Sequence, residues 1–414
     1  MAVIFVNRFF YPDHSATSQM LSDLAFALAQ KEETVTVITS RLRYDDPAVH
    51  LPDSETVRNV TVKRVWTSRF GRHNLVGRVF DYATFYISAA WAVFHLAQNG
   101  DIVISKTDPP MLGVLTGAIA RARGAKTANW LQDIFPEVAE AVGMGDGRLS
   151  GALFSALRKL RDRSLRNSDA TIAIGERMAA LVKRCGVAKG KVRVIPNWAD
   201  CDSVVPVSPS ENRLRASWGF ANAFVVGYSG NLGRTHEIET LLNAIGHLEA
   251  KRENHPTPIR WLFIGGGAQF DTLKSECAAR GLSSVSFQPY QPRERLALSL
   301  SVADVHLVSL RPELEGLIVP SKFYGVAAAG RAAIFIGDAD GEVARLIAEE
   351  HCGLTVAQGD GAALAQAIET LAADPVLCRA LGESGRRAAE KRFALSTAVI
   401  SWQDLLAALR EKSL

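Results

Sequence analysis

The chain has 414 residues, of which 48% are hydrophobic and 22% charged, and its net charge is only +4. This length exceeds the usual size of one hydrophobic core, so we expect two domains, and the composition excludes a disordered chain. The small net charge argues against a nucleic-acid partner, because phosphate contacts need a concentrated basic face. The five cysteines form no C-x-x-C pair and have no zinc-ligand spacing, which predicts no metal site and a reducing, cytoplasmic compartment. Met1–Val6 has no basic leader, which predicts no signal peptide.

Strand and helix patterns alternate from the start of the chain. Short apolar runs predict strands, and apolar residues at helical spacing predict helices. In order these are strand Ala2–Val6, helix Ser18–Gln30, strands Thr34–Thr39 and Ile102–Ser105, helix Met111–Arg123 and strand Lys126–Leu131. This rhythm is typical of a parallel sheet covered by helices on both faces.

The same rhythm restarts in the second half. The predicted elements are strand Phe224–Ser229, helix Ile238–Leu248, and strands Arg260–Ile264, Val285–Phe287, Val305–Ser309 and Ala332–Ile336. We therefore predict an α/β fold of two facing, Rossmann-like, doubly wound parallel-sheet domains. The first comprises residues 1–175 plus a returning helix within 397–414, and the second residues 176–396, with the junction near Gly175.

Two helical segments allow two interpretations each. Tyr82–Ala97 is strongly apolar but shorter than the ~20 residues that cross a bilayer, so it is either a buried helix or a helix at a membrane interface. Ala152–Arg166 is amphipathic and basic. Its leucines either pack on the sheet or, with the aromatic and basic stretch Trp66–Tyr82, dock on an anionic membrane.

Three loops after predicted strands carry candidate chemistry. Gly227–His236 places glycines and two basic side chains before a helix, which suits a phosphate, although an ordinary turn is the alternative. Ile264–Ala268 is glycine-rich but lacks the G-x-G-x-x-G spacing of a dinucleotide site. In Arg311–Gly330 a helix starts near Pro320, so that backbone N–H groups and Lys322 can converge on a diphosphate. Its acidic residues either bind sugar hydroxyls or are solvated loop charges.

The ordered set of motifs resembles the GT-B glycosyltransferases of retaining family 4, also called group 1, and especially the branch that builds bacterial surface polysaccharides. The similar segments cover nearly the whole chain. They are NRFFYPDHSATSQMLSDLAFAL (Asn7–Leu28), WLQDIFPE (Trp130–Glu137), KVRVIPNWAD (Lys191–Asp200), YSGNLGRTHEIETLL (Tyr228–Leu242) and the donor loop within Val302–Arg331.

The resemblance implies roles for individual residues. Near the reacting diphosphate and sugar it places Arg234, Lys322 and Glu315. Asp133, in the first domain, is a further catalytic candidate, which rests on a departure from the family pattern rather than on a match. Around the nucleotide-sugar donor it places Ser15, Gly230, Asn231, His236, Gly265, Tyr290, Gly316, Pro320 and Ser321, with Tyr290 beside the base. Catalysis would be electrostatic stabilisation of the leaving diphosphate, with no metal, no other cofactor and no covalent nucleophile.

Three departures from the family pattern stand out. Gly325 occupies the position of the glutamate that holds the ribose in relatives. Ser15-Ala16 stands where many relatives have Gly-Gly. Lys106-Thr-Asp108 replaces the segment that carries a cleft histidine, so Asp108 or Asp133 is a candidate for part of its role.

The expected partners are a nucleotide-sugar donor and a saccharide or polyprenyl-diphosphate-linked acceptor bound by the first domain. The enzyme would be cytoplasmic, with peripheral contact to the inner membrane. Two alternatives stay open, a non-catalytic nucleotide-sugar-binding subunit, suggested by Gly325, and an NAD-dependent enzyme, which the missing dinucleotide fingerprint disfavours.

Overall fold

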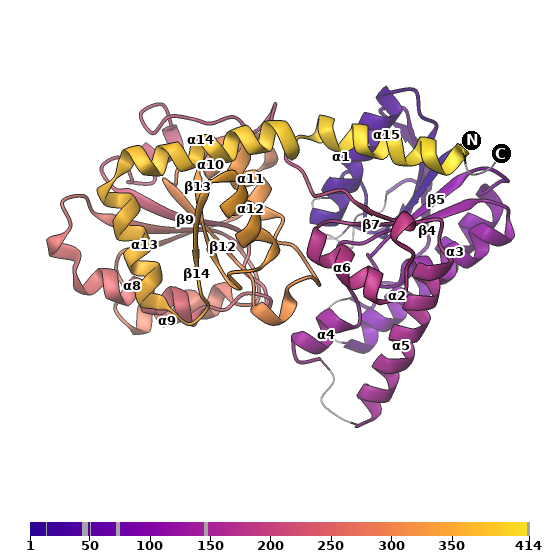
Figure 1. Cartoon of the computed structure of the whole chain (residues 1–414), viewed down its shortest axis with the longest axis horizontal. Helices are drawn as coiled ribbons and strands as arrows, with labels where there is room; N and C mark the ends of the chain where they lie inside the picture. Colours follow the sequence, from indigo (N-terminus) through magenta and orange to yellow (C-terminus); the bar gives the residue numbers. More distant parts are fainter. Residues whose placement is uncertain (14, 44–48, 50, 72–74, 145–147, 412–414) are drawn as a thin grey trace. The chain divides into compact units, whose positions relative to one another are not determined.

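In the computed structural model the chain forms two compact units (Figure 1). Unit 1 comprises Met1–Pro196 and Ala398–Leu414, and unit 2 comprises Asn197–Thr397. The structure describes residues 1–13, 15–43, 49, 51–71, 75–144 and 148–411.

Unit 1 contains an eight-stranded sheet in the order β3-β4-β2-β1-β5-β6-β7-β8. All neighbours pair in parallel except β3 and β4, which form an antiparallel hairpin at one edge. The strands are β1 (Val3–Val6), β2 (Val35–Ser40), β3 (Ser54–Val57), β4 (Val60–Val65), β5 (Ile102–Lys106), β6 (Lys126–Trp130), β7 (Ala170–Ala173) and β8 (Val192–Val194). The helices between them are α1 (Ala16–Gln30), α2 (Leu75–Leu96), α3 (Leu112–Ala122), α4 (Glu137–Ala141), α5 (Arg148–Asn167) and α6 (Glu176–Arg184).

The last helix, α15 (Leu395–Glu411), begins in unit 2, and its residues from Ala398 onward belong to unit 1. Trp402 is fully buried there, with its ring centroid 4.9 Å from that of Trp130 and 6.1 Å from that of Phe5. At the far end of the helix, Arg410 forms an ion pair with Glu33 at 2.5 Å. The final helix is therefore part of the core of unit 1 despite its distance in sequence.

Unit 2 contains a six-stranded, all-parallel sheet in the order β11-β10-β9-β12-β13-β14. The strands are β9 (Phe224–Asn231), β10 (Ile259–Gly266), β11 (Val285–Gln288), β12 (Val305–Ser309), β13 (Ala332–Ile336) and β14 (Gly353–Val356). The helices are α7 (Arg213–Ser217), α8 (Glu239–Ala250), α9 (Phe270–Ala279), α10 (Leu296–Leu300), α11 (Lys322–Ala328), α12 (Glu342–Glu350), α13 (Gly361–Ala373) and α14 (Pro375–Arg392). The prediction of two doubly wound parallel-sheet units is confirmed.

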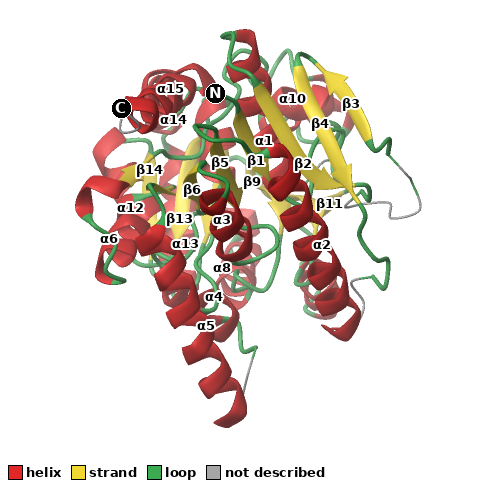
Figure 2. Cartoon of the chain, turned by 90° about the vertical axis from the view of Figure 1, so that its right-hand side faces the viewer, coloured by secondary structure: helices red, strands yellow, loops and turns green. Residues whose placement is uncertain are grey.

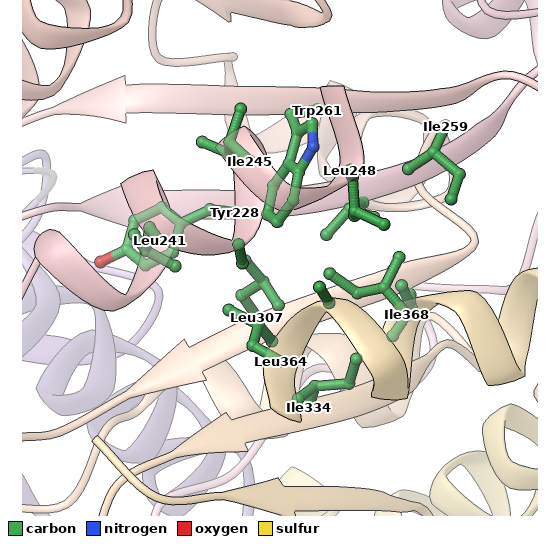
Figure 3. Close-up of a cluster of buried hydrophobic side chains, with 14 of the residues drawn as sticks. Tyr228, Leu241, Ile245, Leu248, Ile259, Trp261, Leu307, Ile334, Leu364 and Ile368 are labelled. Carbon is green, nitrogen blue, oxygen red and sulfur yellow. The ribbon is translucent and has the colours of Figure 1, made fainter. Parts of the chain in front are cut away.

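The main core of unit 2 lies between the sheet and helices α8 and α13 (Figure 3). Apolar side chains of β9, β10, β12 and β13 meet leucines and isoleucines of the two helices, because every strand of a covered parallel sheet is buried. Tyr228 borders this cluster with its ring, while its hydroxyl points away from the apolar side chains (Figure 3). This orientation places the Tyr228 hydroxyl beside Nζ of Lys322.

The structure differs from the sequence-based expectations in three places. The units divide after Pro196 rather than near Gly175, because β8 pairs with β7 and so extends the first sheet. Helix α2 is buried on one face only, since Phe85 and Val93 are inaccessible while other apolar side chains are exposed. On α5 the interpretation that the leucines pack on the sheet does not hold for Leu153 and Leu160, which are exposed. The helix instead buries the side that carries Arg161, Ser164 and Leu165.

Among the helices that the structure describes, none is both long enough and apolar enough to cross a membrane.

Replacing Trp402 by alanine is expected to lower the free energy of unfolding of unit 1 by about 3–5 kcal/mol, because the change empties a fully buried site between Phe5 and Trp130. The measurement is urea unfolding followed by circular dichroism. The matched control is Ile400→Ala on the same helix, whose side chain is 59% exposed. Equal stability of the Trp402→Ala variant and the control would contradict this packing role.

Candidate functional site

The candidate site lies in unit 2 at the carboxyl ends of β9, β10 and β12, the central strands of the sheet. In an open parallel sheet these ends are where ligands bind, because the loops that follow neighbouring strands converge there. The three loops predicted to carry chemistry all begin at this edge.

Two glycine-rich turns bring backbone close to backbone at this edge. Gly230 has φ +125° and Gly265 has φ +132°, a region that side chains with a Cβ rarely adopt. A Cβ atom at Gly265 would lie 2.2 Å from the carbonyl oxygen of Gly230, so no larger residue fits. The ring of Tyr290, which is 60% exposed, lies against Gly265 and Gly266. The end of β10 thus exposes backbone beside an aromatic side chain.

Lys322 is the central cation of the site. Its Nζ donates a hydrogen bond to the hydroxyl of Tyr228 and lies 3.3 Å from Nε2 of His236. The Tyr228 hydroxyl in turn donates to the carbonyl oxygen of Asn231 at 3.0 Å. Gly230 borders the lysine, since a Cβ there would lie 3.9 Å from Lys322 Cε. The first residue of α11 is therefore tied to the end of β9 by its ammonium group.

His236 acts as a neutral acceptor in this cluster. Its Nδ1 lies 2.9 Å from the carbonyl oxygen of Ser309, which can only accept, so Nδ1 carries the proton. Nε2 is then unprotonated and accepts from Lys322. Burial of the ring, together with the charge of Lys322, lowers the pKa of His236 to about 3. His236 therefore holds the lysine in place rather than adding a second positive charge.

The pKa of Lys322 is lowered to about 7 because burial removes its ammonium from water. The charged form is consequently under-stabilised in the free protein. An anion placed next to Nζ would restore that missing stabilisation, so the cluster suits a phosphate or diphosphate group.

The loop between β9 and α8 differs from its expected role. The N-terminus of α8 is occupied by the chain itself, because the Glu237 carboxylate accepts hydrogen bonds from the amides of Glu239 and Thr240. Those amides are not open to a ligand. Arg234 is exposed, three residues after Asn231, which is also exposed. The cationic side chain of this loop is thus available at the surface, whereas its helix dipole is already compensated.

Glu315 has a structural partner within unit 2. Its Oε2 accepts a hydrogen bond from the backbone amide of Glu342 at 3.1 Å, the first residue of α12. Gly341 makes the approach possible, because a Cβ there would lie 2.3 Å from Glu315 Oε1. The alternative of a solvated loop charge therefore does not describe Glu315, although it does describe Glu313, which is exposed and pairs with Arg311 at 3.5 Å.

The remaining predicted residues of the donor loop lie around Lys322. Gly316 is buried with φ +78°, which allows the turn after Glu315. Pro320 is buried. Ser321, which immediately precedes α11, is exposed. Gly325 lies inside α11, where a Cβ would meet only Leu300 Cδ1 at 3.6 Å. The space beside Gly325 is ordinary, so packing does not explain the absence of a side chain at this position.

Two predicted site residues, Ser15 and Asp133, belong to unit 1. Ser15 precedes α1, and its amide donates to Asp13 Oδ1 at 2.8 Å. Asp133 follows β6, and burial raises its pKa to about 6 against a hydrogen bond from Thr107. Nearby, the buried Lys106 donates to the carbonyl oxygen of Thr17 at 2.7 Å, and burial holds the pKa of this lysine well below its usual range. Asp133 is thus a carboxyl group that exchanges protons near neutral pH.

Sequence reasoning missed Tyr228 and Ser309, which position Lys322 and His236. Both residues lie in predicted strands. A polar residue in a strand usually alternates with apolar neighbours for structural reasons and does not by itself indicate a functional site. The phenol of Tyr228 at the end of a buried strand was the available signal. Among the described residues, no group of three or more His, Cys, Asp or Glu side chains is placed to hold a metal ion.

Two family models match the chain, one for each half. Residues 16–198 match the glycosyl transferase 4-like domain, and residues 210–388 match the glycosyl transferases group 1 domain. The chain is a group 1 glycosyltransferase with the GT-B fold. The matched models describe transferases, so the NAD-dependent alternative is wrong.

Two curated relatives and one solved structure place this glycosyltransferase among similar proteins. WbjE of Pseudomonas aeruginosa, named as a glycosyltransferase, is 28% identical over 66% of this chain and 67% of its own length. WcaI of Escherichia coli K12, whose name refers to colanic acid biosynthesis, is 28% identical over 55% of each chain. The structure of Anabaena HepE in complex with UDP-glucose superposes with a TM-score of 0.71 at 16% identity, covering 99% of this chain and 100% of that one. The last likeness shows the fold.

Replacing Lys322 by methionine is expected to stabilise the glycosyltransferase at pH 7, on the order of 2 kcal/mol, because it removes a charge that burial disfavours. The lysine has a pKa of about 7 when folded and 10.5 as its ordinary value. The unfolded chain therefore binds more protons between these values, and the free energy of unfolding of the wild type rises with pH across this window. Urea unfolding at pH 6, 8 and 9 measures the free energy of unfolding of both proteins. In the variant this free energy should no longer show the part of the rise with pH that Lys322 causes.

The control for this prediction is Lys251→Met, since the Lys251 side chain is 55% exposed. A stability change of the same size in this control, or an unaltered pH slope in Lys322→Met, would refute the burial of the ammonium as its cause.

Proposed function

We propose that this glycosyltransferase moves a sugar from a nucleoside-diphosphate sugar to a saccharide or polyprenyl-diphosphate-linked acceptor in bacterial polysaccharide synthesis, with retention of anomeric configuration. The observation that supports the donor assignment is the Lys322 ammonium, enclosed between Tyr228 and His236 beside the glycine backbone at Gly230. A diphosphate leaving group carries the anionic charge that this cation lacks.

Polysaccharide synthesis is supported by the names of relatives. WcaI is named for colanic acid biosynthesis, and HepE was crystallised with UDP-glucose. We extend to this chain the broad classes that these names suggest, a polysaccharide product and a nucleoside-diphosphate-sugar donor.

Electrostatic stabilisation of the leaving diphosphate is the proposed source of catalysis. Negative charge grows on the β-phosphate as the glycosidic bond breaks, and a preorganised ammonium at Lys322 stabilises the transition state more than the ground state. Arg234, exposed on the loop after β9, supplies a second cation to the same phosphates. Diphosphate binding raises the pKa of Lys322 and so completes its protonation at neutral pH.

Retention is proposed without a covalent protein nucleophile. The carboxylate of Glu315 accepts a hydrogen bond from the Glu342 amide, an interaction that fixes its position and weakens it as a nucleophile. Its role in the proposal is to accept a hydrogen bond from a sugar hydroxyl. Unit 1 would bind the acceptor, where Asp133, with a pKa raised to about 6, is the candidate to take up the acceptor's hydroxyl proton.

The decisive experiment is to incubate the protein with UDP-, GDP- and dTDP-sugars plus lipid-linked and free saccharide acceptors, and to measure nucleoside diphosphate release. Lys322→Ala is expected to lower kcat by about 100-fold or more, since it removes a preorganised charge. Arg234→Ala should also lower kcat/KM strongly. Lys251→Ala is the matched surface control and should keep wild-type turnover.

Near-normal turnover of Lys322→Ala in a folded protein would refute the phosphate assignment. Binding of a nucleotide sugar without any diphosphate release, across all donors and acceptors, would instead favour the non-catalytic subunit.

The transfer is also proposed to need no divalent cation, because lysine and arginine side chains supply the positive charge. Activity is expected to be unchanged within about twofold after treatment with EDTA and removal of the chelator. Loss of turnover that Mg²⁺ or Mn²⁺ restores would contradict this part of the proposal.

A further inference from the structure

Helix α2 exposes a continuous apolar stripe. Its members recur at spacings of three and four residues, so they share one face of the helix. They are Val76, Phe80, Ala83, Ile87, Trp91 and Phe94. Ile87 is 68% and Trp91 67% exposed, values unusual for large apolar side chains. From Val76 to Phe94 the stripe extends about 27 Å at the helical rise of 1.5 Å per residue.

The exposure of the stripe does not result from poor packing of α2 on unit 1, because the opposite face of the helix is well buried. Phe85, Ala89 and Val93 are inaccessible and belong to a core cluster of unit 1, against β2, β4 and α3. The exposed face has its own internal contacts. Phe70, in the loop before α2, lies 5.7 Å from Phe80 between ring centroids, and Trp91 lies 6.4 Å from Phe94.

Exposed apolar residues continue onto the neighbouring helices. α3 packs against both α2 and α5, and the three helices lie on the same side of unit 1 (Figure 2). Leu115 of α3 and Leu153 and Leu160 of α5 are exposed. Each of the three helices on this side of unit 1 (Figure 2) therefore exposes large apolar side chains, and those of α2 form a continuous stripe of the kind that marks an interaction surface.

The charge of the same helices is strongly one-sided. Asp81 and Asp162 are the only acidic residues in the sequences of α2, α3 and α5. Both are engaged within unit 1, Asp81 with Arg8 at 3.6 Å and Asp162 with Arg161 at 2.7 Å. The exposed basic side chains of α5 are Lys159, Arg163 and Arg166.

A basic residue also borders the stripe itself. The guanidinium of Arg123, just after α3, lies 5.2 Å from the ring centroid of Phe94 at the end of the stripe. Arg69 and Trp66 are exposed in the segment that leads from β4 to α2. Aromatic and aliphatic side chains bordered by arginine and lysine are the composition of helices that lie in a membrane interface.

We infer that the exposed faces of α2 and α5 form a docking surface for a bilayer with anionic headgroups, α2 inserting its apolar stripe and α5 supplying the cations. A second copy of the chain fits less well, because an isologous pair through this face would bring the basic residues of α5 against the same patch of its partner. Lipid acyl chains and anionic headgroups complement both properties at once. The inference rests on the proposed function only for its purpose, the delivery of a lipid-linked acceptor to unit 1.

The first test is sedimentation of the full-length protein with vesicles, in the absence of donor and acceptor. Binding is expected to phosphatidylglycerol–phosphatidylethanolamine vesicles and to weaken at high salt or on phosphatidylcholine. Phe80→Ser/Ile87→Ser should weaken partitioning by at least about tenfold, because two large apolar side chains lose their lipid contacts. Val376→Ser/Ile400→Ser is the matched control, with two exposed apolar residues on α14 and α15.

The basic half of the surface has its own variants. Lys159→Glu/Arg163→Glu should reduce binding to the anionic vesicles, whereas Arg387→Glu/Lys391→Glu on α14 should not. Circular dichroism checks that each variant is folded.

A depth measurement uses the exposed tryptophans. Trp66 and Trp91 are exposed, whereas Trp130, Trp198, Trp261 and Trp402 are buried. Lipids brominated on their acyl chains should therefore quench the fluorescence of the bound protein, and Trp91→Phe, which keeps the apolar surface, should lose much of that quenching without losing binding.

Three results would overturn the inference: no vesicle binding by the wild type, equal loss in the variants and their controls, or a dimer in solution that Phe80→Ser/Ile87→Ser dissociates while vesicles are ignored. The last result would assign the stripe to self-association. Vesicle binding and diphosphate release are separate measurements, so failure of docking leaves the proposed transferase activity standing, and silence of every donor leaves the docking surface standing.

Discussion

The removal of one ammonium group from water is the constraint on which the proposed donor site of this glycosyltransferase depends. Lys322 is enclosed by a phenol and a neutral imidazole, neither of which supplies a negative charge. The protein thus keeps a cation in an environment that lowers its pKa to about 7. Keeping Lys322 charged lowers the stability of the free protein, and a bound anion would offset that loss. The same side chain therefore affects both stability and anion binding.

The surrounding loops serve that arrangement. Ser309 fixes the tautomer of His236 through its carbonyl oxygen, and the strand end at Asn231 accepts from Tyr228. Helices α8 and α12 of unit 2 have their amino ends compensated by carboxylates of the chain, α8 by Glu237 and α12 by Glu315. The helix dipoles of α8 and α12 are therefore already compensated, whereas the side-chain cations of this edge remain available to the proposed diphosphate. Gly230 and Gly265 have no Cβ atom, so the backbones of β9 and β10 approach each other closely at this edge.

In unit 1, helix α2 has one buried face and one face exposed to solvent. The same helix, α2, contributes Phe85 to the core and exposes Ile87 to solvent. A stripe of this length would be a liability for a purely aqueous protein, because it invites association. In the proposed docking, this stripe and the basic helix α5 on the same side of unit 1 (Figure 2) share one counterpart, an anionic lipid surface. The proposed chemistry therefore lies at the sheet edges, and the proposed membrane attachment lies on the helices of unit 1.

The sequence by itself determined the fold class and the order of the motifs, because burial of a parallel sheet imposes apolar strands and helical spacing that can be read locally. It also singled out Lys322, since a proline-started helix with a lysine is a local pattern. It missed the β3–β4 hairpin, whose turn at Arg58 and Asn59 lacks a glycine. Only the tertiary structure decided that His236 is a neutral acceptor, that Tyr228 belongs to the site and that α2 is exposed on one face. Each of these depends on which groups from distant segments share a space, and that determines burial, protonation and hydrogen-bond direction.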